Sequence, residues 1–282
     1  MENGINLESH EKEIASDDRF AFGDNWRAFL DTINDERIEV AVKSLRDRLQ
    51  MDSLDGKTFL DMGSGSGLFS LSARKLGAKV YSFDYDPESV ACTKMLRERY
   101  FPDDPDWEIE RGDVLDESYL KRYGKCDIVY SWGVLHHTGN MYKGLDNAGR
   151  HVKRGGKLFI SIYNQQGLKT RLWTKVKRTY NLLPGGLRWL IIVPSFIVLQ
   201  MPTAIMDVVH HGNPFYSWNT HQRNRGMSPW HDLVDWVGGY PFETAKPEEI
   251  FNFYHAKGFV LESLCTCGGG LGCNEYVFSK QS

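Results

Sequence analysis

A glycine-rich loop and two nearby acidic residues are the first candidates for chemistry in this chain. The segment Asp61-Met-Gly-Ser-Gly-Ser-Gly67 holds three alternating glycines, and Asp84 comes 21 residues after Gly63. Backbone N–H groups in such a loop approach a ligand beside the N-terminus of a helix. A carboxylate at the position of Asp84 can accept hydrogen bonds from both hydroxyls of a ribose. Together, these features predict a site for a nucleotide-like ligand.

The residues around the glycines distinguish two classes of nucleotide. The dinucleotide fingerprint G-x-G-x-x-G/A needs a small residue at the position that Leu68 occupies here. The carboxylate of Asp61 would repel a pyrophosphate but attract an ammonium group. We therefore expect an adenosine that carries a cationic tail. A nicotinamide oxidoreductase is the alternative that these residues oppose.

Several segments, in order along the chain, resemble the motifs of class I S-adenosylmethionine-dependent methyltransferases. They are Asp61–Gly67, Tyr81–Ser89, Gly112–Val114, Asp127–His137 and Arg150–Gly156. The fourth segment resembles that of small-molecule members such as the ubiquinone-biosynthesis and sugar O-methyltransferases. The resemblance covers residues 57–163. It leaves 1–50 and 164–246 uncovered, and these are the regions where such enzymes usually select an acceptor.

The resemblance implies S-adenosylmethionine as the cofactor, S-adenosylhomocysteine as the product, and no metal. Asp61 is expected near the ammonium of the donor, Asp84 on its ribose and Asp113 on the adenine amino group. Ser131 and Trp132 would line the path to the sulfonium. The residues assigned to the donor are Asp61, Gly63, Ser64, Gly65, Gly67, Asp84, Tyr85, Asp113, Val114, Ser131 and Trp132. Tyr85 and Val114 would lie beside the adenine, although ordinary core packing is the alternative for Tyr85 and Trp132.

Three residues are the candidates for catalysis. Methyl transfer requires alignment and exclusion of water, and it needs a base only when the acceptor arrives protonated. His136 and His137 follow the fourth predicted strand, and Tyr163 ends the fifth. By resemblance to sugar O-methyltransferases, His136 is the candidate base for a hydroxyl of a sugar-, quinol- or lipid-linked acceptor. Capping of the loop backbone is the alternative. Because Asn164 stands where some relatives have a supporting acid, an N- or S-acceptor remains open.

Alternating strands and helices must position these side chains. Strands are predicted at 57–62, 79–83, 107–110, 127–131 and 157–163, with helices at 68–76, 87–100, 119–123 and 141–152 between them. A helix at 247–257 and an antiparallel pair at 259–266 and 275–280 follow. This order predicts an α/β fold with a doubly wound, mostly parallel seven-stranded sheet, a Rossmann-like methyltransferase core.

The predicted domain organisation has four parts. Residues 1–50 form an N-terminal helical lid, 51–163 the S-adenosylmethionine-binding core, 164–246 an inserted substrate cap, and 247–282 the C-terminal end of the core sheet. The cap is rich in His, Arg and aromatic residues, which suits a wall for a polar or anionic acceptor. The predicted acceptor-binding residues are Asn164, His221, Arg223, Arg225, His231 and Tyr240. Solvated arginines in a surface loop are the alternative.

Charge is unevenly distributed, although the net charge is only −3. Ten basic and no acidic residues lie between Asp146 and Asp207, so the rest of the chain carries 24 basic and 37 acidic residues. The basic residues of a helix at 165–181 are predicted to lie mainly off its apolar side. The apolar run Trp189–Leu199 is too short to span a bilayer and is interrupted by Pro194. For this run, the alternatives are a buried cap helix, a homodimer contact, or a peripheral membrane contact through anionic headgroups. The basic residues leave open a methyltransferase that modifies transfer RNA, but nucleic acid is the least favoured partner.

Composition sets the remaining expectations. Five cysteines and no apolar segment within Met1–Phe20 suggest a reducing cytoplasm. Cys265, Cys267 and Cys273 lack the paired spacing of a zinc site, so no metal is expected. The histidines of the cap also lack compact ligand spacing. A binding protein that has lost turnover is a further alternative to an enzyme.

Overall fold

The structure, a computed structural model, describes residues 33–217 and 229–281. Most of the predicted N-terminal lid lies outside these residues. Its described part is helix α3, Asp35–Leu49, which begins where the side chain of Asn34 accepts a hydrogen bond from the N–H of Arg37 at 3.0 Å. This capping bond satisfies one of the N–H groups that the first helical turn leaves without a helical partner.

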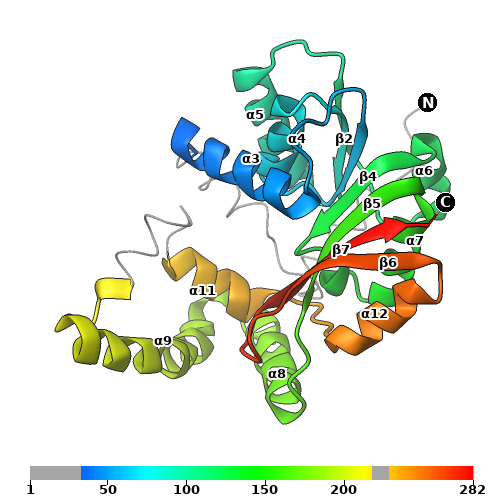
Figure 1. The fold of residues 1–282 in the computed structure, drawn as a ribbon. Helices are drawn as coiled ribbons and strands as arrows, with labels where there is room; N and C mark the ends of the chain where they lie inside the picture. Colours follow the sequence, from blue (N-terminus) through cyan, green and yellow to red (C-terminus); the bar gives the residue numbers. More distant parts are fainter. Residues whose placement is uncertain (1–32, 218–228, 282) are drawn as a thin grey trace.

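Seven strands form one sheet in the order β3-β2-β1-β4-β5-β7-β6 (Figure 1). The strands are β1 Thr58–Met62, β2 Lys79–Asp84, β3 Trp107–Arg111, β4 Cys126–Trp132, β5 Val152–Tyr163, β6 Phe259–Cys265 and β7 Cys273–Lys280. Strands β1 to β5 pair in parallel, and β7 runs antiparallel to both β5 and β6. The predicted fold is therefore confirmed. Strand order reverses between β1 and β4, the position where open α/β sheets bind ligands.

Helices cover both faces of the sheet because the strands are apolar on both sides. Leu60 and Met62 of β1 face one core, whereas Phe59 faces the other, and all three are fully buried. Burial of each such side chain contributes about 2 kcal/mol to folding. Figure 1 shows α3, α4 (Leu68–Lys75) and α5 (Pro87–Tyr100) on one face. The other face carries α6 (Glu117–Leu120), α7 (Met141–Arg150) and α12 (Pro247–His255).

Two predicted boundaries in this core are wrong. Helix α7 ends at Arg150 rather than Val152, and the Gly155-Gly156 pair lies inside β5 instead of forming a turn before it. The pairing register shifts at this point, between Cys126 and Ile128 of the neighbouring strand. A Cβ on Gly156 would lie 2.7 Å from the backbone oxygen of Asp127. The glycine therefore permits a close approach of the two backbones at an irregular point of the ladder.

Residues between β5 and α12 form a separate helical group. Its helices are α8 (Leu168–Leu182), α9 (Trp189–His211) and α11 (Pro229–Gly238), which Figure 1 shows beyond the end of the sheet where β5 leads into α8. They share a small core of Trp173, Tyr180, Ile192, Leu233 and Val237. This arrangement is compatible with a cap, which remains a prediction.

The predicted break at Pro194 is also wrong. Helix α9 runs for 23 residues through both Pro194 and Pro202. Each proline removes one helical hydrogen bond, but both residues are exposed, so solvent can satisfy the carbonyls that lose their partners. A buried cap helix was one of the alternatives for this run. The helix is instead largely exposed, since only 11% of its most apolar stretch is buried.

Candidate functional site

The glycine loop lies at the carboxyl end of β1, where the backbone turns sharply into α4. Gly63, Gly65 and Gly67 have φ angles of 92°, 53° and 81°, which L side chains rarely adopt. The N–H groups of Gly63 and Ser64 both donate to the carbonyl of Phe83, at 2.8 and 3.0 Å. A Cβ on Gly63 would lie 2.3 Å from Val134. The loop is therefore fixed against both neighbouring strand ends.

The carboxylate of Asp84 connects this loop to the end of β2. Its Oδ2 accepts the N–H of Gly65 at 2.9 Å, and its Oδ1 accepts the N–H of Asp86 at 3.0 Å. An ionised carboxylate can accept about four hydrogen bonds, more than these two amides supply. Asp84 can therefore hold the loop and bind ligand hydroxyls at the same time, as the predicted ribose contact requires.

The carboxylate of Asp61 is almost completely buried, at 1% exposed. Its Oδ2 accepts a hydrogen bond from Ser70 at 2.5 Å, whereas its Oδ1 has no hydrogen-bond partner among the described residues. Burial raises its pKa to about 7; the Ser70 hydroxyl opposes this shift and the charge of Asp84 adds to it. A buried carboxylate oxygen without a donor is costly. The site therefore fits a cationic ligand group, as predicted for the donor ammonium.

The predicted adenine side lies at the ends of β2 and β3. The N–H of Gly112 donates to the backbone oxygen of Asp84 at 2.9 Å, which places Asp113 close to Asp84. Oδ1 of Asp113 accepts the N–H of Leu115 at 2.8 Å, and Val114 is buried in the core. The structure thus brings Asp84, Tyr85 and Asp113 to one edge of the sheet.

Arg111 was not singled out from the sequence, yet it belongs to this edge. Its guanidinium lies 5.8 Å from the ring centre of Tyr85, and its Nε donates to the Tyr85 carbonyl at 3.0 Å. Both Nη atoms are buried without hydrogen-bond partners among the described residues. In the sequence, its only signal was its place directly after the strand predicted at 107–110, one residue before Gly112.

Ser131 and Trp132 lie at the end of β4, but in different surroundings. The hydroxyl of Ser131 is fully buried and donates to the carbonyl of Met62 at 2.7 Å, which connects β4 to the start of the glycine loop. Trp132 is 42% exposed, and its indole N–H donates to Glu275 of β7 at 3.0 Å. Their contact with a donor remains a prediction.

The three predicted catalytic residues form one aromatic cluster. The ring of His136 lies 4.5 Å from that of His137 and 4.1 Å from that of Tyr163, centre to centre. His136 is fully buried, and neither ring nitrogen makes a hydrogen bond of normal geometry to a described residue. Nδ1 of His137 lies 2.6 Å from the carbonyl of Pro241. Because a carbonyl only accepts, Nδ1 of His137 carries a hydrogen.

Burial lowers the pKa of His136 well below its ordinary value, and the charges of His137 and Lys177 lower it further, whereas the backbone of Ser161 opposes the shift. The imidazole is therefore neutral at pH 7, the form that accepts a proton. Such a ring is a weak base, so it is suited to an acceptor whose own proton is fairly acidic.

Lys177 of α8 corrects the prediction that this side chain lies off the apolar side of its helix. It is fully buried, and its ammonium lies 3.8 Å from the ring centre of Trp236, 4.7 Å from Phe242 and 5.9 Å from Tyr163. It also donates to the backbone carbonyl of Trp236. The aromatic faces and this carbonyl stabilise a charge that burial alone would disfavour. Its angular position, beside Trp173 and Tyr180, was the signal in the sequence.

The predicted acceptor-binding residues are only partly described. His221, Arg223 and Arg225 lie outside the described residues, and the side chain of His231 is not described although its backbone is part of α11. Asn164 accepts a hydrogen bond from Asn274 at 3.2 Å, and its N–H donates to Gly272, so it joins β5 to the β6–β7 connection. Tyr240 is half-buried next to the segment that covers the histidines.

The described residues offer no cluster of side chains suited to a metal. Within 33–217 and 229–281, no group of three or more His, Cys, Asp or Glu side chains has an arrangement that suits a metal ion. Burial raises the pKa of Cys273 to about 12, so its thiol stays protonated at neutral pH. The thiol of Cys267 donates to the carbonyl of Gly270 at 3.1 Å.

Comparison with known proteins identifies the family and the fold. The family model described as a methyltransferase domain matches residues 34–203, more than half of the chain. A ubiquinone biosynthesis O-methyltransferase from Coxiella burnetii (strain Dugway 5J108-111) is 32% identical over 139 residues, 49% of this chain and 57% of the relative. The same enzyme from Nitrosococcus oceani is 33% identical over 138 residues, 48% of this chain and 56% of the relative. The chain thus matches little more than half the length of these relatives.

A solved structure shares the fold. Magnesium protoporphyrin IX methyltransferase from Synechocystis PCC 6803, with bound SAH, superimposes with a TM-score of 0.51 at 14% identity. The superposition covers 87% of this chain and 82% of that structure. At this identity the likeness is one of fold alone.

Proposed function

Because this chain belongs to the class I S-adenosylmethionine-dependent methyltransferases, we propose that it methylates a small-molecule acceptor, with S-adenosylmethionine as donor. One observation carries the proposal: a buried carboxylate with an unpartnered oxygen, Asp61, lies directly before a left-handed glycine loop that Asp84 holds. A cationic amino-acid tail joined to a ribose has the two chemistries that this pair of carboxylates recognises.

The fit of the donor follows from these residues. Asp61 provides a negative charge for the ammonium, Asp84 accepts from the ribose hydroxyls, and Asp113 accepts from the adenine amino group. Bound S-adenosylmethionine supplies an electrophilic methyl group on a sulfonium. Tyr85 and Val114 border the adenine position, where apolar surface excludes water.

We further propose a hydroxyl as the acceptor group. His136 lies beside Tyr163 at the carboxyl ends of β4 and β5, and its neutral ring takes the hydroxyl proton at a ring nitrogen. Because its pKa is lowered, proton transfer is more favourable from an acidic hydroxyl, such as that of a phenol or quinol, than from a sugar. The ubiquinone-biosynthesis enzymes among the relatives support a quinol-like acceptor. A small-molecule amine or thioether, which needs less help from a base, is the second candidate.

Two titrations test the proposal. S-Adenosylhomocysteine should quench or shift the tryptophan fluorescence of the protein saturably, whereas NADH should not compete with it. Formation of S-adenosylhomocysteine is then measured with a phenol, a sugar and an amine of matched size as acceptors. Binding of NADH instead of S-adenosylhomocysteine would overturn the donor assignment. Turnover with the amine alone would overturn the hydroxyl acceptor.

A further inference from the structure

Helix α9 presents a long apolar surface that the described protein does not cover. The segment Gly185–His211 is long and apolar enough to cross a membrane, yet only 11% of its most apolar stretch is buried. The large apolar residues of α9 with at least 45% exposure are Trp189, Leu190, Val193, Ile197, Val198, Met201, Ile205, Met206, Val208 and Val209. A helix that is apolar around its circumference is normally buried in a protein core or in lipid. Some apolar partner must therefore cover it.

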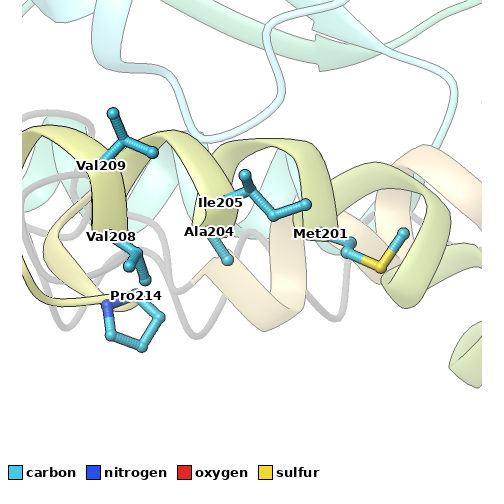
Figure 2. A pocket seen from close by; sticks show the side chains of 6 residues that line it. All are labelled: Met201, Ala204, Ile205, Val208, Val209 and Pro214. Carbon is cyan, nitrogen blue, oxygen red and sulfur yellow. The ribbon is translucent and has the colours of Figure 1, made fainter.

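The exposed surface includes a shallow apolar groove at the C-terminal half of α9. Its volume is about 330 Å³, and its walls are Met201, Ala204, Ile205, Val208, Val209 and Pro214. Figure 2 shows these side chains following the helix, with the ring of Pro214 beside Val208. The lining is hydrocarbon and thioether with almost no polar surface, which suits contact with acyl chains.

Helix α8 adds positive charge and further apolar residues. Lys169, Arg171, Lys175 and Arg178 are exposed, and none forms an ion pair with a described residue. Leu168 and Leu172 are 81% and 61% exposed between these cations. Several basic residues of the core are instead paired with acids, as in Lys153 with Asp127 and Lys157 with Glu262. Helix α8, which packs beside α9, therefore presents four exposed cations in a stretch of the chain that holds no acidic residue.

The topology favours an arrangement of α9 in the plane of a membrane over one that spans it. Helix α11 follows it, and side chains from α8, α9 and α11 share one core. At its C-terminal end, Asp207 accepts hydrogen bonds from the N–H and hydroxyl of Ser217, at 2.8 and 2.6 Å. The chain then returns to the sheet at β6 and β7. The N-terminal half of α9 thus belongs to the folded domain, and the chain returns to that domain after the helix, so we expect α9 to lie in the plane of a membrane.

We infer that the outer faces of α8 and α9 form a docking surface for an anionic lipid bilayer. The occupant follows from charge complementarity: there is no acidic residue between Asp146 and Asp207, and the α8 cations face headgroups while α9 enters the acyl boundary. Helix α9 begins at Trp189, which is 58% exposed and follows Arg188. Tryptophan and arginine side chains are typical of the headgroup region of a membrane. The functional consequence rests on the proposed function. Docking brings the acceptor side of the site to the membrane, where a lipid-soluble hydroxyl compound resides.

Flotation of the full chain with vesicles tests this surface. The protein should float with phosphatidylcholine–phosphatidylglycerol vesicles and much less with phosphatidylcholine alone, and high salt should weaken binding. The double variant Lys175→Ala, Arg178→Ala should bind about 25-fold more weakly, at about fivefold per cation. The control Lys43→Ala, Lys94→Ala removes two exposed cations on α3 and α5 and should bind as wild type.

A second pair of variants tests the apolar face. The double variant Ile197→Asp, Met201→Asp should reduce vesicle binding at least about tenfold. The control double variant Val40→Asp, Val260→Asp places two charges at exposed apolar positions elsewhere and should bind vesicles as wild type does. Affinity for S-adenosylhomocysteine, measured in parallel, should be unchanged, which separates failure of this inference from failure of the donor site. Absence of binding to anionic vesicles at low salt would overturn the inference. So would a wild-type dimer that the Ile197→Asp, Met201→Asp variant converts to a monomer, because a second copy would then cover α9.

Discussion

Replacement of Asp61 by asparagine should change the pH dependence of stability in a defined direction. Burial raises the pKa of Asp61 from 3.8 to about 7, so the folded protein holds a proton that the unfolded chain releases. Stability contributed by this group is present below the unfolded pKa and is lost as pH rises to about 7. The shift of roughly three units corresponds to about 4 kcal/mol, of which about 3 kcal/mol falls between pH 5 and pH 8.

Urea unfolding at pH 5 and pH 8 measures this effect. The difference in unfolding free energy between Asp61→Asn and wild type should increase by about 3 kcal/mol from pH 5 to pH 8, in favour of the variant. Asp127→Asn is the control: the Lys153 ammonium and Thr58 outweigh the effect of burial and lower the Asp127 pKa to about 2, below this range. A pH-independent difference for Asp61→Asn would refute the reasoning.

The same carboxylate should connect stability to ligand binding. Because an ammonium favours the ionised form of Asp61, binding of S-adenosylhomocysteine should release a proton near pH 6 and strengthen as pH rises to about 7. Calorimetry in buffers of different ionisation enthalpy detects that proton. Asp61→Asn should bind more weakly and release none. Equal proton release by both proteins would place the ammonium elsewhere.

Two further predictions concern the aromatic cluster. His136→Ala should lower kcat with a hydroxyl acceptor by about 100-fold while leaving affinity for S-adenosylhomocysteine nearly unchanged; wild-type turnover would remove His136 from the mechanism. Lys177→Met should raise the pKa of His136, because a nearby positive charge is removed, and should move the acid limb of the kcat profile to higher pH. If the acid limb of the kcat profile stays at the same pH, Lys177 does not act on His136.

The core and the donor side were predictable because local signals and global topology agree there. The glycines before α4, the N-cap Asp86 and Pro87 at the start of α5 each mark a boundary that the structure confirms. Parallel strands bring their carboxyl ends to one edge, so motifs far apart in the chain converge. The Gly155-Gly156 pair was less predictable, since glycines that allow close backbone approach in a strand resemble those that form a turn.

The helical group beyond the sheet was predicted less well. Whether Lys177 faces solvent or an aromatic cluster depends on α11 and on the segment around Phe242, which come some sixty residues later in the sequence. Pro194 is a helix breaker by local preference, but the long apolar helix continues through it. In both cases tertiary context overrides a local propensity.

The donor site is the central claim, and one calorimetric comparison tests it most directly. Wild type should bind one equivalent of S-adenosylhomocysteine. Asp84→Ala should bind at least about 100-fold more weakly, because two charge-assisted hydrogen bonds to the ribose are lost. Thr93→Val, which removes the hydroxyl bonds to Ser64 and Gly65 at 3.0 and 3.2 Å, controls for loosening of the loop and should lose much less affinity. No binding to wild type, or equal affinity in a folded Asp84→Ala protein, would contradict the account.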